Sequence, residues 1–74
     1  MNHNFMKNLG QKHPDLSFNE RMMCAYLKMN LSSKEIAPLL NISIRGVETI
    51  RYRLRKKFEL DREINLIDYL NSGF

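Results

Sequence analysis

One segment, residues 41–58 (NISIRGVETIRYRLRKKF), constrains the fold most, because it predicts a long helix with two chemically opposite sides. Ser43 is a candidate N-cap, and about four helical turns follow it without a proline. Apolar residues recur every three or four positions and form one stripe, at Val47, Ile50, Leu54 and Phe58. We expect this stripe to be buried against the rest of the chain.

The other side of this helix is polar and mostly basic. A rotation of about 100° per residue places Arg45, Thr49, Tyr52 and Lys56 opposite the stripe, flanked by Glu48 and Arg53. Residues 45–57 hold six basic side chains and one acidic side chain, a net +5, whereas the whole chain carries +4. The positive charge is therefore concentrated on one helix, which indicates a polyanionic partner.

Length and composition indicate one small globular domain. A chain of 74 residues, 43% of them hydrophobic, is near the lower limit for folding on a single core. The single cysteine, Cys24, cannot form a disulfide within the chain, and no run approaches the ~20 apolar residues of a membrane span. The opening Met-Asn-His-Asn lacks the pattern of a secretory signal. These features predict a cytoplasmic protein.

Residues 1–15 form an N-terminal extension in this interpretation. Phe5, Met6 and Leu9 predict one or two helical turns, ended by Gly10 and limited by Pro14. A helix that short is marginal by itself. Two alternatives stay open: it docks on the core, or it is the end of a longer helix from an upstream domain.

Two further helices are predicted before residue 41. In the first, residues 16–29, Ser17 and Glu20 have the spacing of a capping box, and Asn30 suits a left-handed end. The buried stripe of that helix is Met23, Cys24 and Leu27, continued by Leu31, so Cys24 is interpreted as a core residue and not as a nucleophile.

The second of these helices, residues 32–40, has a capping box at Ser32 and Glu35. Pro38 lies inside it, where we expect a local bend and not a break. A connection of about three residues then leads to the helix after Ser43, which predicts a helix-turn-helix. Gly46 is either merely tolerated or allows close approach of a phosphate or base, and the second interpretation is favoured.

A last helix is predicted from an Asp61 N-cap to Asn71. It has two apolar stripes: Ile64, Ile67 and Leu70 with Leu60 ahead of them, and Leu66 with Tyr69. One stripe is enough to close a small core, and the pattern does not decide which. The other is a candidate contact surface, with Leu66, Tyr69 and Leu70 as candidates for a weak homodimer contact.

Residues 16–70 resemble the LuxR-type (GerE-like) helix-turn-helix domain of bacterial transcription regulators. The marks are LSFNE at 16–20, LSSKEIA at 31–37, the IS…VET…R pattern from Ile42 to Arg51, and KKF ending at Phe58. The resemblance implies an all-α, compact four-helix domain over residues 16–71, here with a short extra N-terminal helix. It also implies a recognition helix at 43–58, a dimer surface on the last helix and a position at the end of a longer regulator.

Carried over residue by residue, the resemblance assigns base reading to Glu48, Thr49 and Tyr52, and phosphate contacts near Lys34, Gly46 and Arg53. There are departures from the family pattern. Glu48 stands where lysine is frequent, Ile50 replaces a common histidine, and Asn30 and Glu59 occupy positions often held by glycine. Pro38 is also not typical of the family's second helix.

Physical chemistry supports the same function independently of the resemblance. The recognition helix would enter the major groove of double-stranded DNA, with Arg45, Glu48, Thr49 and Tyr52 at base edges. Phosphate candidates lie at the start of the preceding helix and along the basic side, namely Ser33, Lys34, Gly46, Arg53, Arg55 and Lys56. No cofactor or metal is predicted.

The main alternative is a protein-interaction module, such as an RNA polymerase contact or a domain similar to sigma-factor region 4. Binding to a membrane surface is disfavoured, since the core needs the apolar stripe of the basic helix. An enzyme is not expected: His3 and His13 are isolated, and the sequence has no metal-ligand spacing, phosphate-binding glycine loop or nucleophile–base pair.

Overall fold

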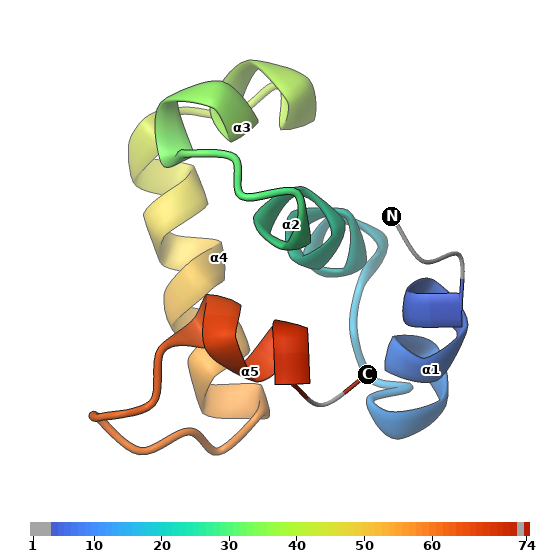
Figure 1. The fold of residues 1–74 in the computed structure, drawn as a ribbon. Helices are drawn as coiled ribbons and strands as arrows, with labels where there is room; N and C mark the ends of the chain where they lie inside the picture. Colours follow the sequence, from blue (N-terminus) through green and yellow to red (C-terminus); the bar gives the residue numbers. More distant parts are fainter. Residues whose placement is uncertain (1–3, 73) are drawn as a thin grey trace.

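The computed structural model describes residues 4–72 and residue 74, and these residues form an entirely helical fold. The elements are α1 (Asn4–Lys12), α2 (Phe18–Lys28), α3 (Ser33–Leu40), α4 (Ile44–Lys57) and α5 (Leu66–Ser72) (Figure 1). The Cα radius of gyration is 11.5 Å, close to the ~11 Å of a compact chain of this length. The predicted all-α class is confirmed. His3 lies outside the described residues.

Helices α2, α3 and α4 begin at the three serines that the sequence indicated. Ser17, Ser32 and Ser43 have extended backbones, and each hydroxyl accepts a hydrogen bond from the amide three residues later. In α2 and α3, Glu20 and Glu35 complete the predicted capping boxes by accepting from the serine amides at 2.7 and 2.8 Å. Short-range chemistry therefore sets these helix starts.

The same three helices end with one recurring hydrogen-bond pattern. Left-handed residues follow each of them, at Asn30 (φ 65°), Asn41 (φ 57°) and Glu59 (φ 54°). The next amide then bonds back five residues, as from Leu31 to the Tyr26 carbonyl at 3.1 Å. This is the Schellman motif, which satisfies the last carbonyls of a helix. Helix α3 passes through Pro38 without a break, as predicted.

Helix α1 docks on the core, which answers the alternative left open by the sequence. Phe5 and Leu9 are both 0% exposed and belong to the same apolar cluster as α2, α4 and α5. The prediction that Gly10 ends this helix is wrong, because α1 continues to Lys12. The His13 amide extends the turn by bonding to the Leu9 carbonyl at 2.8 Å, and Pro14 follows.

Helix α5 differs most from its prediction. It begins at Leu66, five residues after the predicted Asp61 cap, and the Asn65 side chain accepts from the Ile67 and Asp68 amides at 2.8 and 3.3 Å. The segment before it is a turn in which the Ile64 amide bonds to the Asp61 carbonyl. The Asp61 cap is therefore a wrong prediction, and Asn65 performs that function.

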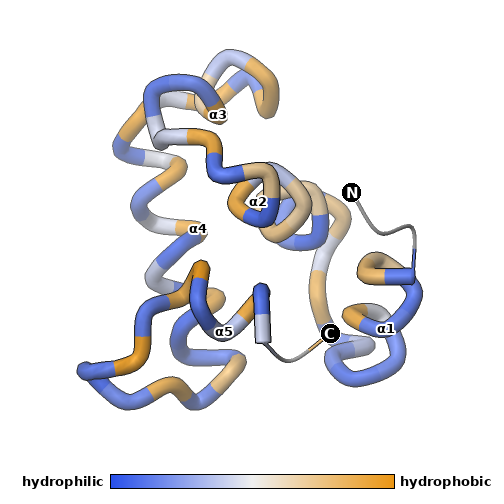
Figure 2. The backbone as a smooth tube through the Cα atoms, in the orientation of Figure 1, coloured by the Kyte–Doolittle hydropathy of each residue, from blue (hydrophilic) through white to orange (hydrophobic). Residues whose placement is uncertain are grey.

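The core lies between α2 and the other helices. In Figure 2 apolar segments are found in α2 and in each of the helices arranged around it. Its buried members come from all five described helices and the segments beside them: Phe5, Leu9, Leu16, Met23, Cys24, Leu27, Ile36, Ala37, Val47, Leu54, Phe58, Leu66 and Leu70. Val47 and Leu54 fix the rotation of α4 about its own axis, so the opposite side of α4 must face solvent.

Candidate nucleic-acid interface

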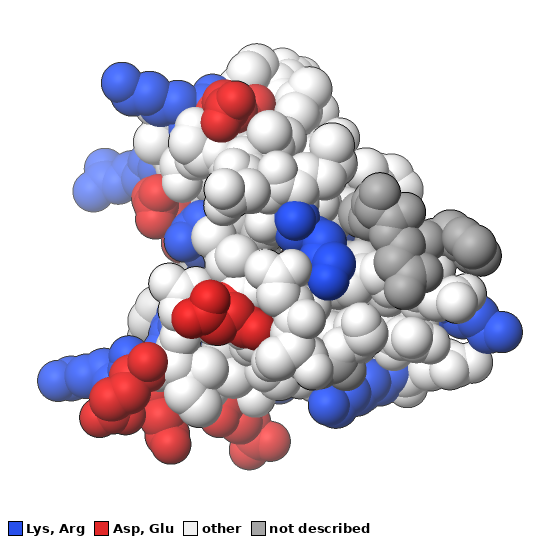
Figure 3. Space-filling model, in the orientation of Figure 1, with Lys and Arg blue, Asp and Glu red and all other residues white. Residues whose placement is uncertain are grey.

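The outward side of α4 is the surface that the sequence predicted. Its side chains are exposed, and the opposite side, at Val47 and Leu54, is 0% exposed. Figure 3 shows Lys and Arg side chains projecting from the edge of the molecule along which α4 lies. We call this surface the α4 face and define it by Arg45, Glu48, Thr49, Tyr52, Arg53 and Lys56.

Tyr52 is the most prominent apolar group on the α4 face. Its residue is 60% exposed, and the Lys56 ammonium lies 5.2 Å from the centroid of its ring. That distance suits a cation–π contact, which holds the lysine beside the ring and leaves its charge accessible. The pair therefore presents an aromatic surface and a cation side by side.

A short hydrogen bond joins α3 to the α4 face. The Ser33 hydroxyl donates to the Glu48 carboxylate, with 2.6 Å between Oγ and Oε1. This length is typical of a hydroxyl bonded to a charged carboxylate. Ser33 was predicted to contact phosphate, but here its one proton is already used. The Thr49 hydroxyl also has a partner, the Arg45 carbonyl one turn earlier at 3.1 Å.

Two basic residues of α4, Lys57 and Arg55, donate hydrogen bonds to other parts of the fold. Lys57 donates to the Glu20 carboxylate at 2.8 Å and to the Asp15 carbonyl at 3.1 Å. Within the described part of the chain, this is the one ion pair. Burial alone would raise the pKa of Glu20, but the hydrogen bonds from Lys57 and Ser17 outweigh it, so the pKa lies below its usual value.

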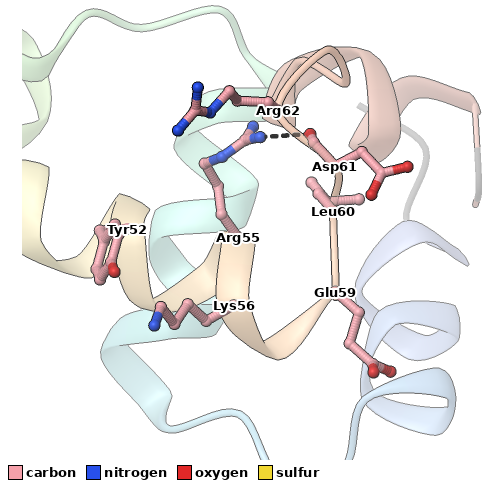
Figure 4. Close-up of a pocket in the computed structure, with 7 residues that line it drawn as sticks. All are labelled: Tyr52, Arg55, Lys56, Glu59, Leu60, Asp61 and Arg62. Carbon is pink, nitrogen blue, oxygen red and sulfur yellow. Dashed lines mark hydrogen bonds between the residues drawn. The ribbon is translucent and has the colours of Figure 1, made fainter.

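Arg55, predicted to contact phosphate, instead reaches the loop between α4 and α5. Its guanidinium donates to the Ile64 and Asp61 carbonyls, the latter at 2.7 Å. Figure 4 shows Arg55 turned toward Asp61, in an open hollow that Tyr52 and Lys56 also line. Helical spacing could not reveal these partners, since they lie in a loop six and nine residues later.

The remaining predicted phosphate residues occupy two places. Lys34 is exposed near the start of α3, and Arg53 and Lys56 are exposed on α4. Gly46 is half-buried, and its amide donates to the Ser43 hydroxyl at 3.0 Å. A Cβ added at Gly46 would lie 3.4 Å from Ile42 and Ser43, so the fold itself does not require glycine there.

The candidate dimer residues are mostly inside the molecule. Leu66 and Leu70 are 3% and 0% exposed. They lie one turn apart on α5, which packs against α2. Tyr69 is half-buried, and its hydroxyl pairs with the His13 ring nitrogen Nε2 at 2.8 Å. A dimer contact through Leu66 and Leu70 would have to open the core, so these two side chains are not available for it on the folded chain. The dimer itself stays a prediction.

The described residues give little support for a metal site, a reactive thiol or a membrane-spanning helix. No group of three His, Cys, Asp or Glu side chains within residues 4–72 and 74 is arranged to hold a metal ion. Burial raises the pKa of the Cys24 thiol to about 12, with the Glu20 charge adding to the effect. No helix of the described part is long and apolar enough to cross a membrane.

In comparisons with protein-family models, curated protein sequences and solved structures, nothing matches this chain. The resemblance to LuxR-type domains therefore depends on the residues quoted for it in the sequence.

Proposed function

We propose that this chain is a sequence-specific, double-stranded DNA-binding domain of the LuxR-like helix-turn-helix kind, with α4 as its recognition helix. The observation that carries the proposal is the α4 face itself. Six side chains that the sequence predicted to contact DNA are all exposed on one side of one helix, while the other side is buried. Such a helix holds its polar side chains at a fixed rotation relative to the core.

The dimensions and charge of this surface suit duplex DNA. A helix of 14 residues is about 21 Å long, and the major groove is about 12 Å wide, enough to admit a helix. Arg53 and Lys56 supply cations for phosphates, and Lys34 supplies another from α3. Neutralising phosphates releases counterions, which favours binding at low salt.

The backbone supports the family part of the proposal. LuxR-type domains often have glycine at two positions that Asn30 and Glu59 occupy here. Both residues are left-handed, with φ of 65° and 54°, the conformation that glycine adopts without strain. The connection from α3 to α4 also has the short length of a helix-turn-helix, with Asn41 left-handed and Ser43 starting α4.

The test is selection of bound sequences from random DNA, followed by affinity measurements across salt concentrations. We expect a defined site, with affinity falling steeply as salt rises. Tyr52→Ala and Thr49→Ala should relax the sequence preference, whereas Lys56→Ala should weaken all DNA similarly and reduce the salt slope by about one.

A matched control is available on the surface of the same chain. Lys7 is an exposed cation on α1, away from the α4 face, so Lys7→Ala should change neither preference nor slope. Equal behaviour of Lys7→Ala and Lys56→Ala, or full affinity and discrimination in all three α4 variants, would show that α4 is not the recognition helix.

A further inference from the structure

We infer that Ser33 is a positioning residue that aims the Glu48 carboxylate at the amino group of a cytosine in the bound site. The inference rests on the proposed function and deepens it. Its basis is the 2.6 Å hydrogen bond from the Ser33 hydroxyl to Glu48 Oε1, which joins two helices across 15 positions of the chain.

The hydrogen bond restricts a side chain that otherwise has several conformations. Both residues lie at the surface, Ser33 half-buried and Glu48 exposed. Arg45 is one turn before Glu48 on the same helix face and could attract its carboxylate. With Oε1 held by Ser33, Oε2 is the oxygen left to accept a hydrogen bond from a ligand, because the described residues provide no hydrogen bond to it.

The chemistry of a carboxylate then selects the base. An ionised carboxylate only accepts hydrogen bonds. In the major groove, guanine presents two acceptors and thymine presents an acceptor and a methyl group, so both leave the charge without a donor. Adenine offers an amino group beside an acceptor, whereas cytosine offers its amino group alone. Glu48 therefore favours cytosine, and does so largely by rejecting the other bases.

The same bond changes the role of Ser33. A serine hydroxyl has one proton, and while it is donated to Glu48 it cannot be donated to a phosphate. Ser33 thus acts on base preference through Glu48. A phosphate contact by Ser33 would instead strengthen binding to every sequence and contribute nothing to preference.

The experiment measures base preference for the wild-type chain and the variants Glu48→Gln, Ser33→Ala and Ser33→Thr. Bound sequences are selected from random DNA, and affinities are then measured for the selected duplex and its single-position variants at several salt concentrations. Glu48→Gln identifies the position that Glu48 reads. At that position the wild type should prefer cytosine by about tenfold or more.

Ser33→Ala should reduce the cytosine preference at that one position severalfold, with an unchanged salt slope, and Ser33→Thr should restore the preference because it restores the hydroxyl. Glu63→Gln, which removes an exposed charge between α4 and α5, should leave the preference unchanged. Thermal unfolding of each variant verifies that it is folded.

Other outcomes overturn the inference in distinguishable ways. Full cytosine preference in Ser33→Ala, or a uniform loss of affinity with a smaller salt slope, would show that Ser33 does not position Glu48. A preference for another base at the Glu48 position would refute the assignment of cytosine. Absence of salt-dependent DNA binding by the wild type would instead refute the proposed function.

Discussion

At the scale of single residues, Glu20 connects two parts of the molecule through one carboxylate oxygen. Its Oε1 accepts from the Ser17 amide at the start of α2 and from the Lys57 ammonium at the end of α4. The residue is only 6% exposed, so its charge is compensated by these two donors and not mainly by water.

We expect Glu20→Gln to lower the free energy of unfolding by about 1–2 kcal/mol at neutral pH. Because the pKa of Glu20 is lowered in the folded state, its stabilisation is complete above the unfolded value of about 4.5 and is lost as the pH falls through the folded value. Urea denaturation at pH 7 and at pH 3 should show that the difference in free energy of unfolding between the variant and the wild type is smaller at pH 3. Glu35→Gln removes the charge of the equivalent capping residue, which has no lysine partner among the described residues, and should lower the free energy of unfolding by less.

Glu59 is the residue whose backbone is least suited to its side chain. It is left-handed with φ 54°, a conformation that costs a residue with a Cβ about 1–2 kcal/mol. We expect Glu59→Gly to raise the free energy of unfolding by about 0.5–1 kcal/mol, measured by urea denaturation. Glu63 lies in the loop before α5 and has no positive φ, so Glu63→Gly should not raise the free energy of unfolding. An equal increase in both variants would show that the left-handed backbone of Glu59 is not the cause.

Gly46 allows the stability of the fold and the binding of DNA to be tested separately. Because the fold leaves room for a Cβ there, Gly46→Ala should stabilise the isolated chain by about 0.5 kcal/mol through helix propensity. We also expect it to weaken DNA binding, since the added methyl group would keep the backbone away from a phosphate. Urea denaturation of Gly46→Ala tests the expected stabilisation, and its DNA affinity tests the expected loss of binding. Unchanged DNA affinity would mean that Gly46 is only tolerated.

At the scale of secondary-structure elements, the start of α5 depends on one side chain. Asn65 accepts from two amides of the first turn, and the helix has only seven residues. We expect Asn65→Ala to cost about 1 kcal/mol in urea denaturation. Asp61→Ala removes the side chain first predicted as the cap and should cost clearly less; the reverse order would contradict the assignment.

At the scale of the whole molecule, α1 is part of the core that supports α4. Phe5 is 0% exposed, and Phe18, on α2, is 70% exposed. We expect Phe5→Ala to lower the free energy of unfolding by about 3–5 kcal/mol. That is most of the total free energy of unfolding of a domain of this size. Phe18→Ala is the matched control and should stay within about 0.5 kcal/mol of the wild type. A small effect of Phe5→Ala, measured by urea denaturation, would show that α1 docks only weakly.

The sequence by itself determined those features that depend on residues three to five positions apart. The serine caps, the left-handed end at Asn30 and the buried and exposed sides of α4 belong here, because hydrogen bonds within one turn and the helical repeat decide them. The predicted α4 face is therefore found where the spacing placed it.

The tertiary structure alone decided which side chains have distant partners. Lys57 contacts Glu20 across 37 positions of the chain, so this cation of α4 serves the fold. Ser33 contacts Glu48 across 15 positions, so one carboxylate of the α4 face is oriented by α3. The inward side of α5 was equally undetermined: the sequence offered two apolar stripes, and packing against α2 buries one residue of each, Leu70 from the first and Leu66 from the second. Such choices depend on the shape of the completed core, which no local pattern contains.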